Sequence, residues 1–394
     1  MKKAICLTAL ACASFLASNA HALDIAGFEV TGYSRGGPVF NPTDGIKGNL
    51  SLGGDLQKFR LGNEGDNGIE VNVARTFEVD GVKWKVDYMP AKWGSGSVST
   101  EQAYVEMSGL SFAPEAKFWV GQRRLRIQDI HILDNFLLNY GDNEGAGFTD
   151  LQVGSVKLGV GVFTGDKFDS QLPANVKANR VNFDISDIQT NPGGKLRVLL
   201  TAMTGTGLVA GNNGSGISLM HQQADFFGAG INNTLYLQAS RGHARIDGQF
   251  EAIDGVNAGK RVTRIADAVN WQLGRFGGQA LVAYQTNKDD LTGVNTKDFS
   301  LGGRGSYAFS KNFKMLTELS TTTRKGAGAD QRLSKLTVAA ALALAEDFWS
   351  RPELRFYVTK ANWNQAAALA NAATFGAGGK TSRTLVGVQY EVWW

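Results

Sequence analysis

The last nine residues, Val386–Trp394, constrain the fold more strongly than any other segment of the chain. Successive side chains of a strand point to opposite sides, so this segment predicts a strand with one apolar face that ends on an aromatic residue. An apolar outer face and a polar inner face suit a closed β-barrel in lipid, whereas the last strand of a soluble β-sandwich is the alternative. The apolar face carries Val386, Val388, Tyr390, Val392 and Trp394, and the other face carries Gly387, Gln389, Glu391 and Trp393.

The same two-residue alternation recurs along the chain, from Phe28–Arg35 to the two segments that flank Asp80-Gly81. Asp-Gly is a preferred sequence for the two-residue turn of a β-hairpin. Such a turn fixes which residues of the flanking strands face each other, and here it keeps the apolar and polar faces consistent. The expected cross-strand pairs are Val79 with Val82 and Glu78 with Lys83.

Three features of the composition narrow the class of protein. After the first 22 residues the longest apolar run is Val338–Ala345, far short of the ~18 residues that a membrane-spanning helix requires. The 40 basic and 36 acidic residues are too evenly balanced for a dedicated nucleic-acid-binding protein. The 49 glycines, 22 phenylalanines and 8 tryptophans favour strands that are joined by tight turns.

The N-terminus predicts export from the cytoplasm. Two lysines and an apolar segment precede Ala20-His21-Ala22, which offers small residues at both positions that signal peptidase reads. We expect a signal peptide over residues 1–22 and a single domain over residues 23–394, with a lipoprotein processed at Cys12 as the alternative. Because Cys6 and Cys12 are the chain's two cysteines, the mature chain of 394 − 22 = 372 residues is expected to contain no disulfide.

The length of the mature chain sets the size of the expected barrel. A tilted membrane strand needs ~9–11 residues, and each strand with its connection uses about twenty. The chain then holds roughly sixteen to eighteen strands, enough to enclose a water-filled channel. Connections are expected where glycine and other small residues cluster, at Gly94–Ser99, Gly205–Gly216, Gly326–Ala329 and Ala366–Gly379.

Five segments spread over the mature chain carry a more specific signal than periodicity does. They are Phe28–Gly36 (FEVTGYSRG), Lys58–Glu64 (KFRLGNE), Trp119–Asp134 (WVGQRRLRIQDIHILD), Phe348–Trp363 (FWSRPELRFYVTKANW) and Val386–Trp394 (VGVQYEVWW). Together, and in this order, they resemble the maltoporins and related sugar-specific porins. The resemblance implies a transmembrane antiparallel β-barrel of about eighteen strands with a third external loop folded inward. It also implies a homotrimer among the lipids of the Gram-negative outer membrane.

The resemblance further implies a row of aromatic side chains along the pore, on which the apolar face of a sugar ring slides. By motif this row includes Tyr33 of the first strand, Trp349 and the penultimate Trp393. It also includes Trp93 on the second external loop, where family members lend a tryptophan to the neighbouring subunit. Alternation independently places Tyr33 and Trp393 on the polar faces of their strands. An aromatic girdle at the lipid interface is the alternative role for all four.

A polar track opposite this row would exchange hydrogen bonds with the hydroxyls of the sugar. The residues that match the family's ionisable positions are Arg35, Arg60, Glu70, Asp129, His131 and Asp134. Phe136 matches a constriction tyrosine and lacks its hydroxyl. For Asp129, His131 and Asp134, the alternative role is to anchor the third loop to the barrel wall.

The sequence departs from the family at several of these positions. Gly68 stands where a tyrosine of the aromatic row belongs, and the middle aromatic of the row aligns near Leu235. Glu101 and Ile127 replace two arginines, for which the neighbouring arginines at positions 123, 124 and 126 are candidate substitutes. The apolar path is therefore expected to be shorter than in maltoporins, and its preference for maltodextrins stays open.

These observations predict a channel for the facilitated diffusion of sugars such as maltose and maltodextrins, with no cofactor, no metal, no nucleic-acid partner and no catalysis. Gly376–Thr381 (GAGGKT) resembles the end of a phosphate-binding loop, but Thr374 stands where the first glycine of that motif is required. No pair among the three histidines after residue 22 has the spacing of helical zinc ligands. The alternatives are a general diffusion porin for small polar or charged solutes and an exported soluble β protein that binds carbohydrate.

Overall fold

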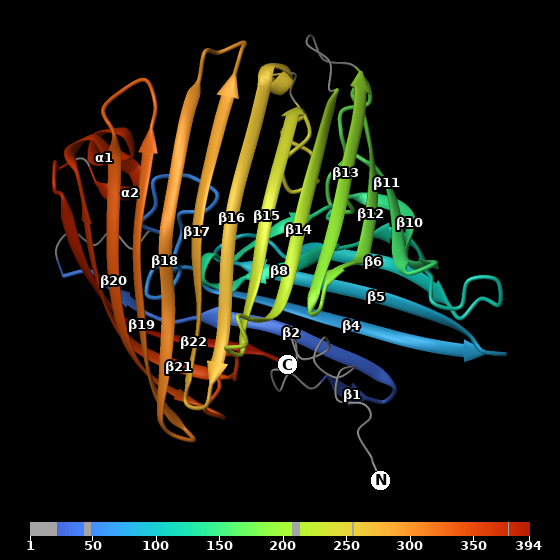
Figure 1. The fold of residues 1–394 in the computed structure, drawn as a ribbon, viewed down its shortest axis with the longest axis horizontal. Helices are drawn as coiled ribbons and strands as arrows, with labels where there is room; N and C mark the ends of the chain where they lie inside the picture. Colours follow the sequence, from blue (N-terminus) through green and yellow to red (C-terminus); the bar gives the residue numbers. More distant parts are fainter. Residues whose placement is uncertain (1–21, 43–48, 207–212, 254–255, 377) are drawn as a thin grey trace.

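The chain forms a closed antiparallel β-barrel of eighteen strands, as the sequence predicted (Figure 1). The computed structural model describes residues 22–42, 49–206, 213–253, 256–376 and 378–394. Closure joins the two ends of the chain, because β2 pairs with β22 in a register that sets Tyr33 opposite Trp393. Within the described residues no helix is long and apolar enough to cross a membrane. The predicted signal peptide lies outside the described residues, apart from Ala22.

The barrel strands follow one another around the ring in chain order. They are β2 (Phe28–Gly36), β4 (Gly68–Val79), β5 (Val82–Trp93), β6 (Ser99–Ser108), β7 (Lys117–Gln122), β10 (Glu144–Val153), β11 (Val156–Thr164), β12 (Lys177–Asn191), β13 (Gly194–Thr206), β14 (Gly214–Phe226), β15 (Ile231–Gly242), β16 (Lys260–Leu273), β17 (Phe276–Asp289), β18 (Asn295–Ser310), β19 (Phe313–Lys325), β20 (Gln331–Ala343), β21 (Glu353–Trp363) and β22 (Ser382–Trp393). The other elements are β1 (Leu23–Ile25), β3 (Val39–Phe40), β8 (Arg126–Ile130), η1 (His131–Leu133), β9 (Asn135–Asn139), η2 (Val256–Gly259), α1 (Gln365–Ala370) and α2 (Ala372–Phe375).

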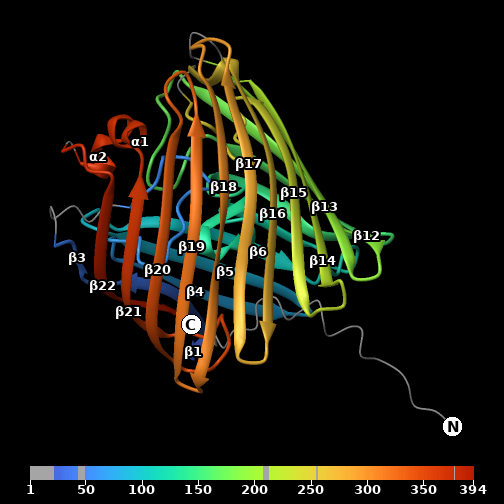
Figure 2. The same cartoon turned by 60° about the vertical axis from the view of Figure 1, so that its left-hand side comes forward.

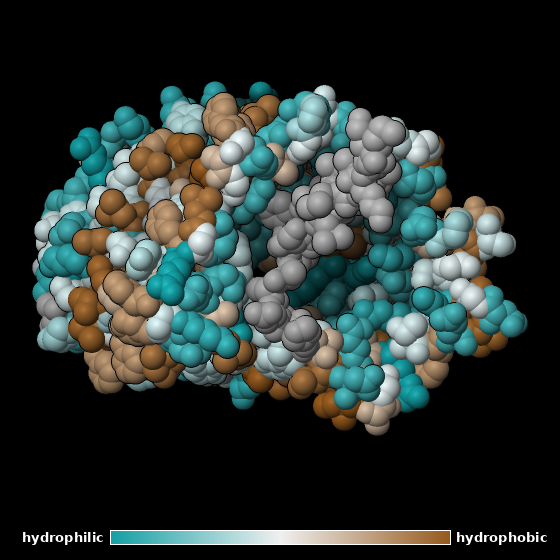
Figure 3. Space-filling view, turned by 60° about the horizontal axis from the view of Figure 1, so that its bottom comes forward, coloured by the Kyte–Doolittle hydropathy of each residue, from teal (hydrophilic) through white to brown (hydrophobic). Residues whose placement is uncertain are grey.

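Alternation along each strand separates an outer apolar surface from a polar lumen. In β21, Glu353, Arg355 and Thr359 are at most 1% exposed, whereas the intervening Phe356 and Val358 are about half exposed. The last strand follows the predicted phase, with Gln389 and Glu391 buried on the lumen side and Val386 and Tyr390 exposed on the outer side. Figure 3 shows the result, since hydrophilic side chains line the hollow and hydrophobic ones gather on the outer surface.

Short turns join the strands at one end of the barrel, and longer connections join them at the other end (Figure 2). Asp80 and Gly81 both have positive φ, 51° and 81°, as a type I′ hairpin turn requires. The predicted pairs Val79 with Val82 and Glu78 with Lys83 are present. Porins carry short turns on the periplasmic side and long loops outside, so the long connections mark the external end.

Two of the connections differ from their expected boundaries. The connection after β21 contains α1 and α2, so it is not a simple loop over 366–379. Helix α1 begins after Asn364, whose side chain accepts a hydrogen bond from the Ala367 amide at 3.1 Å. Phe375 of α2 stacks on Trp363 at 4.5 Å, so this connection packs against the external end of the barrel. Strand β13 extends past Gly205, and β14 begins at Gly214, so the connection between them is shorter than predicted.

Candidate functional site

The third external connection, residues 123–143, folds into the lumen as the resemblance implied. Its strands β8 and β9 form a hairpin around η1, and Leu133, Leu137 and Leu138 are at most 1% exposed. These side chains pack in one cluster with residues of the barrel wall from β13 to β17, including Tyr236 and Leu281. Hydrogen bonds fix the backbone there: Gln238 donates to the carbonyl oxygen of Leu137 at 2.7 Å, and Gln279 accepts from the amide of Ile132 at 3.1 Å.

A second segment also enters the lumen, and the sequence analysis did not predict it. Residues 49–67 of the first external connection lie along the inner wall of β19 to β21. Lys335 donates to the carbonyl oxygens of Leu50 and Phe59 at 3.0 and 3.1 Å, and Thr359 donates to Gly62 at 3.0 Å. The two inward segments meet where the amide of Arg60 donates to the carbonyl oxygen of Ile132 at 2.9 Å. The lumen is therefore narrowed by both segments together.

A buried charge network lies where these segments meet the seam between β2 and β22. Its centre is the Glu391 carboxylate, which lies 2.9 Å from Arg60 and from Arg351 and also pairs with Arg355. The Tyr33 hydroxyl donates to Glu391 at 2.9 Å and accepts from Arg60 at 2.6 Å. Such charge-assisted bonds hold the tyrosine ring in one orientation.

A second group of charges joins the tip of the third connection to the first. Asp134 lies 2.8 Å from Arg35, 2.7 Å from Lys58 and 3.6 Å from Arg60. Glu64 contacts the same three cations at 2.7–3.0 Å. Burial opposes ionisation of Asp134, but the positive charges of Arg60, Lys58 and Arg35 outweigh it and hold the pKa of this carboxyl well below its usual range.

His131 lies between the two charged groups and the aromatic side chains. Its side chain is 3% exposed, with Nε2 3.0 Å from Arg351 and Nδ1 3.4 Å from both Arg60 and Asp129. A side chain that is enclosed in this way fits the interpretation that His131 anchors the third connection. Asp129 and Asp134 keep about a third of their side chains exposed, so they remain accessible from the lumen.

Four predicted aromatic residues are arranged along the wall beside this network. The rings of Trp93 and Tyr33 lie 6.2 Å apart, and Tyr33 faces Trp393 across the β2–β22 seam. The ring of His131 lies 5.6 Å from that of Trp393 and 5.4 Å from that of Trp349. The order Trp93, Tyr33, Trp393, Trp349 leads from the external end of β5 to the turn before β21 at the opposite end. All four side chains are partly exposed.

Trp93 lies in a barrel strand, whereas it was expected on the second external loop. Its ring also explains why glycine stands at position 68, where the family carries a tyrosine. Trp93 ends β5 and pairs with Gly68 of β4, so it is part of the barrel wall and not of the external loop. A Cβ atom on Gly68 would lie 2.0 Å from the Trp93 ring. The ring therefore covers the position where a tyrosine side chain would begin, and Trp93 occupies the place that the absent tyrosine leaves. Its indole N–H donates to Glu70 at 3.2 Å.

Glu101 stands where the family carries an arginine, and a neighbouring cation supplies the positive charge that this arginine would have contributed. Arg124, which directly follows β7 and Arg123, lies 2.6 Å from Glu101 and 2.6 Å from Glu70. The positive charge at this place therefore comes from the third connection and not from β6. Ile127, which replaces the second arginine, packs against the apolar cluster of the third connection.

Two predicted positions do not join the aromatic row. Phe136 lies opposite Asp129 in the β8–β9 hairpin, with the guanidinium of Arg126 5.6 Å from its ring centre. The alignment of a middle aromatic near Leu235 is wrong as a lumen position. The neighbouring Tyr236 points inward and is fully buried against the third connection, so Leu235 faces outward.

The sequence analysis missed the residues that hold the network together. Glu64 and Glu391 lie inside quoted motifs, and alternation had placed Glu391 on the lumen side, but neither had been assigned a role. Arg351 and Arg355 follow Trp349 in another of these motifs. The signal that could have found them is charge balance, because buried arginines require carboxylates within reach. Among the described residues, no group of three histidine, cysteine, aspartate or glutamate side chains is placed to hold a metal ion.

Comparisons with known proteins find relatives that match the whole length of the chain. The chain is 29% identical over 458 residues to the maltoporin of Vibrio cholerae serotype O1, El Tor Inaba strain, with 100% of both chains covered. The maltoporin of the Classical Ogawa strain is equally similar and is covered to 99%. Among solved structures, OccK3 (OpdO) of Pseudomonas aeruginosa shares the fold with a TM-score of 0.50 and 11% identity, over 94% of this chain and 97% of that one.

The match to a family extends from the first residue of the first barrel strand to the last residue of the chain. Residues 28–394 fit the sequence model that is described as LamB porin. The chain therefore belongs to the LamB porin family, and its closed barrel with an apolar outer surface spans the outer membrane of a Gram-negative bacterium.

Proposed function

We propose that this protein is a channel for the facilitated diffusion of sugars, with oligosaccharides related to maltose as the substrate class. The observation that carries the proposal is the row Trp93, Tyr33, Trp393 and Trp349 beside a wall of fixed charges. A pyranose ring has an apolar face of C–H groups that fits an aromatic surface, and a rim of hydroxyls that fits carboxylates and guanidinium groups. The maltoporin names of the relatives agree with this substrate class.

We propose two roles for the predicted polar residues, according to their burial. Arg35 and Arg60 are 5% and 3% exposed and are saturated with carboxylates, so we assign them to positioning the wall. Asp129 and Asp134 are about one-third exposed, and these carboxylates are proposed to accept hydrogen bonds from the passing sugar. Glu70 holds the Trp93 indole in place. Each contact with the sugar must stay weak, because transport requires exit as well as entry.

Transport by this arrangement is passive, and the protein acts as a channel and not as an enzyme. A homotrimer is part of the proposal and rests on the family resemblance. Native mass measurement of the detergent-purified protein would test it, with three copies expected and a monomer contradicting it.

The experiment that tests the substrate class is conductance in a planar bilayer, titrated with maltotriose and then with sucrose. Concentration-dependent block by maltotriose is expected, because an oligosaccharide contacts several rings of the row at once. Open conductance without block by any sugar would favour a general diffusion porin. One observation favours that second candidate: the inward-facing aromatic of β15, Tyr236, is fully buried against the third connection, so β15 adds no accessible ring to the row.

A further inference from the structure

The outer surface of the barrel carries a band of positive charge at the external ends of five successive strands. Each strand from β15 to β19 contributes one exposed cation that points away from the lumen. Alternation fixes this direction, because the residue beside Lys297 is the buried Asp298 of the lumen side. We name this set the rim cations; they are Arg241, Arg261, Lys288, Lys297 and Lys325.

The strand register sets these like charges against one another. Arg261 lies directly opposite both Arg241 and Lys288, and Lys297 lies directly opposite Lys325. Lys288 and Lys297 are diagonal neighbours, since Lys288 pairs with the residue two before Lys297. Like charges that face each other across a sheet are destabilising. Five neighbouring cations therefore require anions nearby to offset their mutual repulsion.

The protein itself supplies few of these anions. Arg261 pairs with Asp290 at 2.6 Å and Lys325 pairs with Asp330 at 3.2 Å, and all four side chains are at least 39% exposed. Within the described part of the chain, neither Lys288 nor Lys297 has an ion pair or a hydrogen bond from its side chain. The band therefore keeps a net positive charge that is open to a partner outside the barrel.

The height of the band relative to the apolar surface indicates what that partner is. On the outer face of β16, the exposed Ile265 lies four residues below Arg261, or about 13 Å along the strand. Between them Thr263 shares a hydrogen bond with Thr286 of β17 at 2.6 Å. The order from lipid to solvent is apolar side chain, hydroxyl and cation. This order is the one expected at the boundary between hydrocarbon and headgroups.

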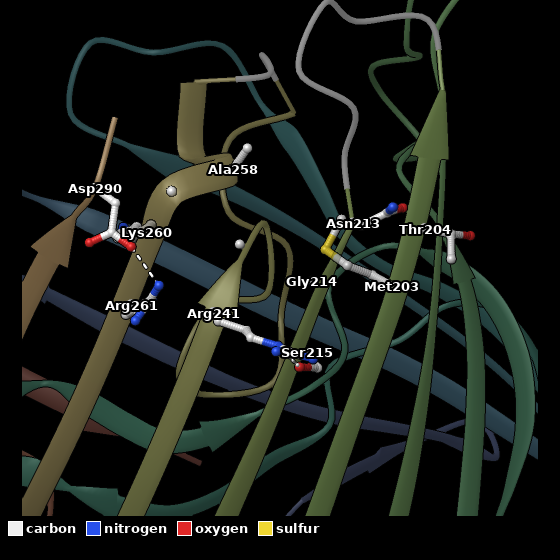
Figure 4. A pocket seen from close by; sticks show the side chains of 12 residues that line it. Met203, Thr204, Asn213, Gly214, Ser215, Arg241, Ala258, Lys260, Arg261 and Asp290 are labelled. Atoms are coloured by element: carbon white, nitrogen blue, oxygen red, sulfur yellow. Dashed lines mark hydrogen bonds and ion pairs between the residues drawn. The ribbon is translucent and has the colours of Figure 1, made fainter. Parts of the chain in front are cut away.

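Figure 4 shows the part of the band around Arg241 and Arg261. Arg241 and Arg261 line a hollow of about 670 Å³ at the ends of β13 to β16, together with Ser215 and Asp290. Further exposed, outward-facing cations lie at the external ends of β5 and β20, at Lys92 and Arg332. The rim cations are distinguished from these two because they face like charges across the sheet.

We propose that the rim cations bind the phosphate groups of lipopolysaccharide in the outer leaflet of the membrane. Phosphate pairs with arginine through two parallel hydrogen bonds and with lysine as a point charge. A glycolipid whose acyl chains cover the apolar surface would place its phosphates at the height of the band. This lipid contact lies outside the lumen and is independent of which sugar passes through it.

The test compares lipid binding by the full-length, detergent-purified protein and two triple variants. The first, Arg261→Gln/Lys288→Gln/Lys297→Gln, removes three rim cations. The second, Lys83→Gln/Arg275→Gln/Lys311→Gln, removes three exposed cations at the opposite end of the barrel and changes the net charge equally. Native mass spectrometry counts bound diphosphoryl lipid A, and the heat-dependent gel shift confirms that each barrel is folded.

The rim variant is expected to bind lipid A about a hundredfold more weakly than the parent, and the control variant is expected to match the parent. Binding by the parent should also weaken as salt increases. Equal binding by parent and rim variant would overturn the proposal, as would equal losses in both variants. Retention of dephosphorylated lipid A by the parent would show that acyl chains alone bind. Displacement of lipid A by inorganic phosphate at the same concentration would identify a site for free phosphate instead.

Discussion

The two sides of the third connection meet walls of opposite character. Toward β13 to β17 the contact is apolar, with Leu137 and Leu138 packed against residues such as Tyr236 and Leu281. Toward the β2–β22 seam the contact is ionic, through Asp134 and the arginines around it. Apolar packing tolerates small shifts, whereas charge pairs with bond lengths near 2.8 Å allow only a few geometries. The comparison indicates that apolar packing holds the connection against the wall, and we expect the ionic side to set the shape of the proposed sugar path.

Removal of the central carboxylate should have the largest effect. Glu391→Ala would leave Arg60, Arg351 and Arg355 without their shared partner in a site that is almost fully buried. We expect the free energy of unfolding to fall by about 3–5 kcal/mol, measured by urea titration of the refolded protein. Glu346→Ala, at a partly exposed carboxylate of a turn, serves as the control. An unchanged unfolding midpoint for Glu391→Ala would show that the ionic side does not support the fold.

A cavity on the apolar side should have the next largest effect on stability and a different effect on transport. Leu137→Ala removes a side chain with 0% exposure from the cluster that mounts the third connection. We expect a loss of about 3 kcal/mol and noisier single-channel conductance, because the connection is less firmly held. Sugar affinity should change little if the ionic side alone shapes the path. If Leu137→Ala lost as much sugar affinity as a variant in the aromatic row, the proposed difference between the apolar and ionic sides would be wrong.

Within the aromatic row, Trp393→Ala should weaken block by maltotriose about tenfold and leave ion conductance similar or higher. The ring offers a sugar an apolar surface, and no other described residue of β22 on the lumen side is aromatic. Trp271→Ala is the matched control, since Trp271 lies on the outer face of β16. Titration of conductance with sugar measures both variants. Equal block of parent and Trp393→Ala would exclude Trp393 from the site.

A smaller effect on sugar affinity is expected at Gly68, where the family carries a tyrosine. Gly68→Ala places a methyl group where the Trp93 ring lies, so the ring must leave the row. The variant should lose sugar affinity about threefold, the same as Trp93→Ala. The double variant should lose no more than either single one, because both act through the same ring. Additive losses would show that Gly68 acts independently of Trp93.

The smallest effect concerns pH and the exposed end of the ionic side. The pKa of Asp134 is lowered in the folded protein, so its stabilising contribution is present above the ordinary aspartate pKa and is lost as pH falls through the lowered value. The difference in unfolding free energy between parent and Asp134→Asn should be about 1 kcal/mol or less, since 35% of this side chain is exposed. It should stay constant from about pH 8 to pH 5 and shrink only below about pH 4. A difference that vanishes near pH 6 would contradict the lowered pKa.

The barrel could be predicted from the sequence because the pattern of apolar and polar residues within each strand shows which of its faces contacts lipid. Alternation, the Asp80-Gly81 turn and the final strand are local features, and each was confirmed by the register. It also selected the four aromatic residues that lie along one wall. The inward course of residues 49–67 was not predicted, because Lys335 and Thr359 contact this segment from strands almost 300 residues away. The position of the Trp93 ring, which takes the place of the tyrosine that the family carries at Gly68, was not predicted either. It depends on a contact between β4 and β5, and a sequence motif does not contain such a contact.

The seam between β2 and β22 has a consequence for how the protein matures. The Tyr33–Glu391 hydrogen bond joins residues that are 358 positions apart, and Arg60 reaches the same carboxylate. Neither contact can form until the last strand has been inserted beside the first. A chain that is still being assembled therefore lacks the complete constriction, and we expect the proposed sugar recognition to appear only when the barrel is closed. A chain truncated before its last strand would accordingly lose selectivity together with its seam.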